Sequence, residues 1–568
     1  MEKLIKMNYF NFEKLTRHKL LLFFLFFVLL QRLYYFNYFY VPNSDFFAFN
    51  ILAQGWLNFN LPENYARLPL YPWIIGIGSL IFHNNQSAVL YFIEIFNLLL
   101  SIVSLYLIYL ISSRFLKNLA FLVVFLVAIN PLSVFLTSQP FLETLLLTTI
   151  LSSIYLDLKD NNKRSFFAFL ASMTRYEGFL LIPILVLKDL VYSKRKLLSV
   201  ILGFLSSVGM IIWMILSYLK SPGPNPYIQA AMTMKPVGPE FIITIANELI
   251  SFIHPDFQSI KGIIVFISLA FFFILMVIGF VWFLKKSIRE IFTILLFLIS
   301  YIAMHMVFSY NLTRFVYPVL WILILLTMGG LEYISNFVNE KNWFYNLNKK
   351  ANMDPFLRSG FYIFSVLTFL TVIYFFTMLN GYFIFVLYII FIMSIISFIS
   401  SIFEGRNFKS LFLISSIVLI FGVFTGFSIY GTQQLMESEK YTKAEFRFVG
   451  EWYLQNAKSN DKILMTEPWI ASYYSDLSYE KHFLASYDLK CNSSDCFISE
   501  LREKNITYVV WDSFFDRISN SSLYYNYYKI NLFSGLSGGK NTENFELVKQ
   551  IEIGPSTAMI YKVLYDVS

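Results

Sequence analysis

Charged residues are scarce in this sequence. Only 14% of its 568 residues are Asp, Glu, Lys or Arg, whereas 57% are hydrophobic and 20% are aromatic. In an ordinary soluble protein about a quarter of the residues are charged. The shortage of charge excludes a typical soluble domain, and the surplus of apolar residues predicts a polytopic α-helical membrane protein.

Cysteine and histidine are also rare, with two and five copies. Two thiols are too few for a tetrahedral zinc site, and His83 and His254 stand alone without the spacing of metal ligands. Cys491 and Cys496 lie in a segment that we expect outside the cell, where oxidising conditions favour a disulfide. The sequence therefore predicts a structural disulfide. It identifies no cofactor with certainty and leaves the use of a divalent metal ion open.

We expect no cleavable signal peptide, because the first apolar run, residues 20–40, is long enough to span a membrane and no small-residue cleavage site follows it. The net charge of +8 collects in short loops between apolar runs, so it indicates topology and not nucleic-acid binding. The basic leader places the N-terminus in the cytoplasm. A total of about 13 spans then places the C-terminus outside the cell, and the chain is predicted to be a multi-pass protein of the cell membrane. Further spans are expected near residues 87–112, 119–137, 141–158, 197–219, 262–284, 291–309, 315–331, 360–379, 382–402 and 410–430.

Two apolar stretches do not fit a simple crossing. Residues 70–82 are too short to span about 30 Å at 1.5 Å per residue, so they predict an interfacial or re-entrant piece. The apolar stretch between Lys163 and Lys188 has basic loops on both sides, and a single crossing would break the charge rule. Two short helices that meet at residues 174–178, with the polar turn near the outer side, resolve this conflict.

The composition divides the chain into two parts. Residues 1–430 form the predicted membrane module, with external loops at 41–86 and 220–261. From residue 431 to 568 the composition becomes that of a soluble protein, and the pattern predicts a small mixed α/β domain outside the cell. The expected helices of this domain are residues 441–457 and 496–504, and the expected strands are residues 463–466 and 506–511.

Four different short motifs lie in the predicted external segments of the membrane module. After the acidic first loop come Arg67-Leu-Pro-Leu-Tyr-Pro, Pro-Phe-Leu-Glu143, Thr-Arg175-Tyr-Glu-Gly and Thr-Arg314-Phe-Val-Tyr-Pro. In this order, over roughly residues 10–330, the motifs resemble the GT-C superfamily of membrane glycosyltransferases, in particular the protein mannosyltransferase and aminoarabinose transferase group (glycosyltransferase family 39-like). The resemblance implies a polyprenyl- or dolichyl-phosphate-linked sugar donor, a protein, lipid or glycan acceptor, and an active site outside the membrane.

Three external carboxylates are candidates for the chemistry. Transfer from a lipid phosphate needs a base for the acceptor's proton, and Asp45 occupies the position of the family's proposed base. The family often has two adjacent acidic residues there, whereas Asp45 is followed by phenylalanine. Glu143 is the second catalytic candidate, and Glu63 is a candidate for orienting the acceptor or a cation. The alternatives are a solvated aspartate for Asp45, a helix-start glutamate for Glu143 and a solvated loop residue for Glu63.

Arginines in outer segments break the usual charge bias and so need a reason. Arg67, Arg175 and Arg314 are candidates to bind the donor phosphate, because a guanidinium makes bidentate contacts with phosphate oxygens. The alternative for Arg67 and Arg314 is snorkelling to lipid headgroups, and for Arg175 it is a salt bridge with Glu177. Arg32, late in the first span, is expected to snorkel outward.

Other functions remain as alternatives. An oligosaccharyltransferase belongs to the same superfamily, but its Trp-Trp-Asp-Tyr-Gly motif is absent from this sequence. A lipid-linked sugar transporter or flippase would usually show paired halves, and no internal repeat is seen. A surface receptor would not need acidic and basic residues spread over several external loops. The sugar, the acceptor and the oligomeric state cannot be read from the sequence.

Overall fold

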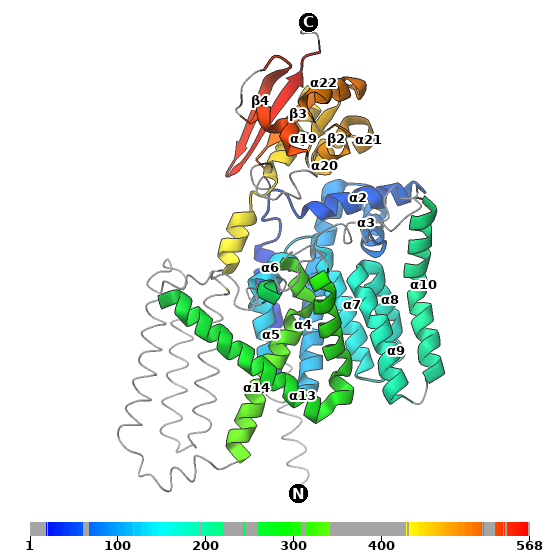
Figure 1. Cartoon of the computed structure of the whole chain (residues 1–568), viewed down its shortest axis with the longest axis vertical. Helices are drawn as coiled ribbons and strands as arrows, with labels where there is room; N and C mark the ends of the chain where they lie inside the picture. The colour runs from blue at the N-terminus through cyan, green and yellow to red at the C-terminus, as the bar shows by residue number, and fades with distance from the viewer. Residues whose placement is uncertain are drawn as a thin grey trace.

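The computed structural model describes two stretches of the chain. In Figure 1 the N-terminal stretch forms a bundle of long helices, and the strands of the C-terminal stretch lie beyond one end of that bundle. The expected spans at 360–379 and 382–402, and nearly all of the one at 410–430, lie outside the described residues. The stretches are residues 19–340 and 428–565, apart from gaps at residues 20, 61–66, 117–118, 194–195, 221–241, 246–259, 308–312, 429–430, 492, 514, 516–528, 538 and 540–541.

Within the described residues, four helices are long and apolar enough to cross a membrane: Gln86–Phe115, Lys196–Lys220, Phe272–Met306 and Thr313–Ile334. A pair of helices bent by 65°, α5 and α6, would make a fifth. The elements of this part are α2 (Ser44–Leu57), α3 (Leu70–Ile81), α4 (Gln86–Phe115), α5 (Ala120–Ile129), α6 (Pro131–Thr137), α7 (Leu142–Asp157), α8 (Arg164–Thr174), η1 (Tyr176–Leu180), α9 (Leu181–Tyr192), α10 (Lys196–Lys220), α13 (Ile260–Val307), η2 (Thr313–Val316) and α14 (Tyr317–Glu340).

Two features of the segment at residues 41–86 differ from the sequence-based expectation or refine it. The segment that carries Asp45 is helical, because Asp45 is the second residue of α2 and lies in its first turn. The predicted short piece at residues 70–82 is α3, a helix of 12 residues. In Figure 1 α2 lies across the end of the bundle that faces the strands, and α3 lies at the same end. Asp45 is therefore held on a rigid element, where the partial positive charge of a helix N-terminus favours its carboxylate.

The turn at residues 174–178 joins two short helices, as the charge pattern predicts. α8 ends at Thr174, and η1 leads directly into α9. Gly178 packs against the backbone of α8 so closely that a Cβ atom there would lie 2.1 Å from the carbonyl oxygen of Ala171. Only glycine fits this contact, and the contact fixes where Arg175 and Glu177 sit.

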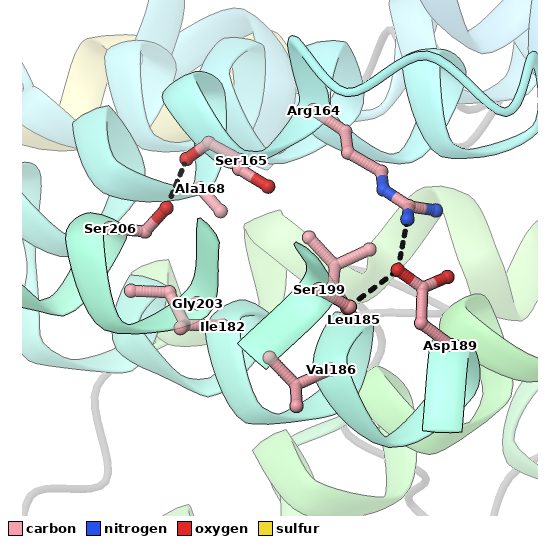
Figure 2. A pocket seen from close by; sticks show the side chains of 10 residues that line it. All are labelled: Arg164, Ser165, Ala168, Ile182, Leu185, Val186, Asp189, Ser199, Gly203 and Ser206. Carbon is pink, nitrogen blue, oxygen red and sulfur yellow. Dashed lines mark hydrogen bonds and ion pairs between the residues drawn. The ribbon is translucent and has the colours of Figure 1, made fainter. Parts of the chain in front are cut away.

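A buried charge network holds the other end of this hairpin. Arg164, the first residue of α8, donates to Asp157 at 2.5 Å and also to Asp189 in α9. Lys188 and Thr293 donate to the second oxygen of Asp157 at 2.6 and 2.7 Å. Figure 2 shows Arg164 facing Asp189, with Ser199 of α10 on the same carboxylate. The space between the side chains drawn in Figure 2, about 10 Å³, holds at most a water molecule. We therefore interpret these ion pairs as contacts that hold the helices together and not as a ligand site.

Arg32 is a correction to the sequence analysis. Its side chain does not snorkel outward, because the residue is only 1% exposed and Nη2 donates to the carbonyl oxygen of Ala128 at 2.8 Å. The same atom lies 3.4 Å from Oγ of Ser133. The helix that runs over Leu21–Tyr34 thus turns this arginine toward α5 and α6. Burial is tolerated because backbone and hydroxyl oxygens receive the guanidinium.

The C-terminal stretch contains a five-stranded mixed sheet in its described part, with strand order β2-β1-β3-β5-β4. Strand β1 is parallel to β2 and β3, while β5 is antiparallel to β3 and β4. Cys491 and Cys496 form a disulfide beside this sheet. The elements are α19 (Ala444–Asn456), β1 (Ile463–Met465), α20 (Pro468–Ser475), α21 (Tyr479–His482), β2 (Phe483–Ala485), η3 (Ser486–Asp488), α22 (Ser494–Glu503), β3 (Tyr508–Asp512), α25 (Ile530–Phe533), η4 (Ser534–Leu536), β4 (Phe545–Ile553) and β5 (Ser556–Val563).

The sheet region docks on α2 and the start of α4 through both apolar and polar contacts. The ring of Tyr473, in α20, lies 4.9 Å from that of Phe47, in α2. The Tyr473 hydroxyl donates to the carbonyl oxygen of Gln86 at 2.5 Å, and Nε2 of Gln86 donates to Asp476 at 2.8 Å. Phe46 of α2 and Phe446 of α19 belong to one continuous buried cluster. The C-terminal region is therefore held against the end of the helix bundle that carries α2 and the start of α4.

Candidate functional site

Asp45 is the centre of a charged cluster at this end of the bundle. Arg314, from η2, donates to one carboxylate oxygen at 2.6 Å, and Arg67 lies 3.5 Å from the other. The amide N–H of Asp45 donates to the side chain of Asn43, the N-cap of α2. Asp45 and Arg314 are about one-quarter exposed and Arg67 is 40% exposed. The cluster can therefore be reached from solvent, while its members are held in place.

The two arginines dominate the electrostatics of Asp45. Burial by itself raises the pKa of this carboxyl, but the guanidinium groups of Arg314 and Arg67 outweigh it and hold the pKa well below its usual range. Lys443 acts in the same direction from further away. In this arrangement Asp45 stays ionised, but it is a weak base while both arginines remain on it.

Glu143 and Glu177 form the buried half of the cluster around Arg175. Nη1 of Arg175 donates to Glu143 at 2.7 Å, and Nη2 donates to Glu177 at 3.0 Å. Each carboxylate is only 1% exposed. Nε of Arg314 lies 3.5 Å from the same Glu143 oxygen, which joins this half to Asp45. The internal salt bridge between Arg175 and Glu177 is thus present, and Glu143 combines a helix-start position with a paired charge.

The Phe315 ring lies close to the guanidinium groups of both Arg175 and Arg314. The guanidinium carbon of Arg175 lies 4.7 Å from the Phe315 ring centroid, and that of Arg314 lies 5.7 Å away. His305, which is 2% exposed, stacks on the same ring and lies 3.9 Å from Glu177. Cation–π contacts of this kind stabilise guanidinium groups away from water. The Phe315 ring therefore restricts the direction in which the guanidinium groups of Arg175 and Arg314 point.

The structure brings together five of the residues singled out from the sequence: Asp45, Glu143, Arg67, Arg175 and Arg314. Glu63 lies outside the described residues. Lys443 and Glu467, from the C-terminal region, also belong to the cluster and were not predicted. Lys443 donates to Oγ of Ser44 at 2.9 Å and to Glu467. Nothing in the sequence pattern marks Lys443, because its role depends on how the two parts of the chain dock.

In the part of the chain that the structure describes, the carboxylates of Asp45, Glu143 and Glu177 each receive an arginine. Among the residues that the structure describes, no group of three or more His, Cys, Asp or Glu side chains could hold a metal. The observed pairing fits an anionic ligand that competes with the carboxylates for the arginines.

Comparison with solved structures gives similar folds over almost the whole chain. The crystal structure of ArnT from Cupriavidus metallidurans bound to undecaprenyl phosphate has a TM-score of 0.56 and 11% identity, covering 96% of this chain and 98% of that one. ArnT in the apo state gives 0.50 and 11% identity over 89% of each chain. The oligosaccharyltransferase of Archaeoglobus fulgidus gives 0.48 and 12% identity, over 93% of this chain and 73% of that one.

Neither the protein-family models nor the curated protein sequences that were compared with the chain give a match. At 11% identity, the likeness to ArnT concerns the fold and not the activity. It extends through both the helix bundle and the C-terminal sheet, because nearly all of both chains is aligned. The predicted combination of a helical membrane-type bundle with a small mixed sheet is therefore confirmed, and this chain has a fold similar to that of ArnT.

Proposed function

We propose that this protein transfers a sugar from a polyprenyl-phosphate-linked donor to an acceptor at the outer face of the cell membrane. The observation that carries the proposal is the contact of Asp45 with Arg314 and Arg67, which combines a carboxylate with two side chains of the type suited to phosphate. The likeness of fold to an ArnT structure that holds undecaprenyl phosphate supports the choice of donor. The proposal includes about 13 spans, a cytoplasmic N-terminus and a C-terminal domain outside the cell.

The donor phosphate would bind to Arg314 and Arg67, the more exposed arginines of the cluster. A phosphodiester carries one negative charge, so it competes with Asp45 for the two guanidinium groups. Once the arginines turn to the phosphate, the carboxylate of Asp45 regains its basicity. Donor binding thus prepares the base that the reaction needs.

In the transfer step the acceptor oxygen or nitrogen attacks the anomeric carbon from the side opposite the phosphate. The new glycosidic bond forms as the bond from carbon to phosphate oxygen breaks. Asp45 takes the acceptor's proton, and the bonding electrons leave with polyprenyl phosphate, whose charge Arg314 and Arg67 stabilise. The anomeric configuration inverts. In this scheme Glu143 and Arg175 hold Arg314 in position from the buried side.

An apolar groove beside the cluster suits the polyprenyl chain. It encloses about 530 Å³ between η1 and α10. Tyr176 at its edge follows Arg175 in sequence, and Leu68, which follows Arg67, belongs to the same apolar cluster as Met210. A lipid held in the groove would carry its phosphate toward the arginines. The lining residues are Tyr176, Phe179, Met210, Ile211, Met214, Ile215 and Tyr218.

The direct test is a donor panel. Purified protein is incubated with undecaprenyl- and dolichyl-phosphate-linked sugars, and released polyprenyl phosphate is detected by mass spectrometry. We expect release from at least one donor, above the rate without protein. A lipid-linked sugar flippase would instead move intact donor across a vesicle membrane without releasing polyprenyl phosphate, and that result would replace the enzymatic proposal.

The pH profile tests whether the donor frees Asp45. In the free protein the arginines keep the pKa of Asp45 well below the usual value of about 3.9, so kcat/KM should keep its full value down to about pH 4. In the donor complex the phosphate takes the arginines and the pKa rises. The acid limb of kcat should therefore lie at a pH at least about one unit higher than the acid limb of kcat/KM. Coincident limbs would show that donor binding leaves Asp45 unchanged.

A further inference from the structure

The C-terminal region contributes a lysine and a glutamate to the site. Lys443 immediately precedes α19, and Glu467 lies between β1 and α20. The two side chains form a salt bridge, and Nζ of Lys443 also donates to Ser44 at 2.9 Å. Ser44 is the residue before Asp45 at the start of α2. The salt bridge therefore lies against the helix end that carries Asp45.

The charges of this pair act on the cluster directly. Lys443 interacts electrostatically with Asp45, and Glu467 does so with both Asp45 and Arg67. The docking contacts of Tyr473 and Asp476 with Gln86 hold the domain against the membrane module. The position of Glu467 relative to Asp45 is thus fixed by packing between two parts of the chain that lie about 400 residues apart in sequence.

One carboxylate oxygen of Glu467 has no hydrogen-bond donor among the described residues. The residue is 2% exposed, and only Oε1 receives Lys443. Oε2 is buried and accepts no hydrogen bond from any residue that the structure describes. Although Glu467 is the N-cap residue of α20, its side chain does not cap that helix. Burial raises the pKa of its carboxyl above the usual value, against the effect of Lys443. A buried acceptor without a donor is costly, so an unpartnered carboxylate oxygen beside a charged cluster needs an explanation, and a ligand hydrogen would satisfy it.

The topology of the sheet places this oxygen where α/β domains bind ligands. Glu467 follows β1 by two residues, at the carboxyl end of the parallel strands β2, β1 and β3. Thr466 and Asp512, at the ends of β1 and β3, are joined by a hydrogen bond of 2.6 Å. In open α/β sheets, ligands bind outside the carboxyl ends of the strands. Here that edge carries the residue that reaches Lys443 and, through it, α2.

We propose that Glu467, held by Lys443, binds the acceptor through a hydroxyl or amine hydrogen and places it beside Asp45. The C-terminal domain would then complete the acceptor subsite and determine which acceptor is used. This inference rests on the proposed function. The cluster pairs four carboxylates, Asp45, Glu143, Glu177 and Glu467, with the cations Arg67, Arg175, Arg314 and Lys443. A bound donor phosphate therefore makes the site negative, which favours a neutral or cationic acceptor group over an anionic one.

The test separates reaction with the acceptor from reaction with water. Glu467→Gln keeps the shape and removes the charge, and Glu480→Gln, on the exposed surface of the same domain, is the matched control. A labelled donor found active in the panel above is supplied with water alone, or with the envelope fraction of cells from which the gene has been deleted. We expect Glu467→Gln to lower transfer to the envelope fraction at least tenfold, mainly through KM. Hydrolysis of the donor should fall by much less than transfer to the envelope fraction, because water does not need the acceptor contact of Glu467.

Lys443→Met provides a second, independent variant. It should weaken transfer to the envelope fraction like Glu467→Gln, and the double variant should be no worse than the poorer single one, because both changes remove the same contact. Unchanged transfer by Glu467→Gln would overturn the acceptor assignment. Equal loss of hydrolysis and transfer would also overturn it, because Glu467 would then act in the step common to both. If the parent protein neither hydrolyses nor transfers any donor, the proposed function itself fails, and this inference fails with it.

Discussion

Asp45→Asn is expected to lower the turnover number by about 100-fold or more while the protein stays folded. The substitution keeps the size of the side chain and its contact with Arg314, but an amide cannot take the proton of the acceptor. The measurement is release of undecaprenyl phosphate at saturating donor and acceptor. Near-normal turnover would remove Asp45 as the base and would return it to the alternative of a solvated aspartate.

The same variant should bind undecaprenyl phosphate more tightly. Asp45 occupies Arg314 at 2.6 Å and Arg67 at 3.5 Å in the described structure, so it competes with the lipid phosphate. Releasing a partly exposed pair of this kind changes the binding free energy by up to about 1 kcal/mol, which corresponds to about a fivefold lower Kd. Slow turnover together with tighter lipid binding distinguishes a lost base from a disrupted site. Weaker lipid binding would show instead that Asp45 is needed to hold the arginines in place.

Local sequence patterns predict the parts of this site that depend on short-range structure. The charge rule requires two helices and a turn at residues 174–178, and Gly178 then fits against α8. The motifs that contain Asp45, Glu143 and Arg314 all lie at helix starts that face the same end of the bundle. Their convergence is what the alternation of spans predicted from the charge pattern leads us to expect. Which carboxylate pairs with which arginine does not follow, because that depends on distances between helices.

The contacts that the sequence does not reveal are the long-range ones. α2 is not recognised as a helix, because its sequence, with Asn, Gly and several Phe residues, lacks a clear helical pattern. The sequence analysis predicts that Arg32 snorkels outward, because the oxygens that receive it, from Ala128 and Ser133, lie about 100 residues away in sequence and cannot be foreseen. Lys443 meets Ser44 across an even longer separation. The pairing of β4 with β5 is not predicted either, because the strands that the sequence pattern indicates, residues 463–466 and 506–511, end before it.

Arg314→Ala is expected to weaken binding of undecaprenyl phosphate on the order of 10- to 100-fold, because a hydrogen bond to a charged group contributes about 1.5–3 kcal/mol. Arg67→Ala should have a smaller effect, since Arg67 is more exposed and lies further from Asp45. Arg114→Ala is the matched control. It also removes an arginine from an ion pair with a glutamate, Glu290, but Arg114 lies in the last turn of α4, away from the cluster.

The order of these effects tests the assignment of the arginines. Arg314 contacts Asp45 and approaches Glu143, so its loss removes the phosphate contact and also leaves Asp45 without its nearer partner. The pKa of Asp45 should then rise toward its usual range, and the acid limb of kcat/KM should move to higher pH in Arg314→Ala. Snorkelling to lipid headgroups, the alternative for Arg314, predicts neither change. Affinity equal to that of Arg114→Ala, with an unmoved acid limb, would therefore assign Arg314 to the membrane surface and not to the donor phosphate.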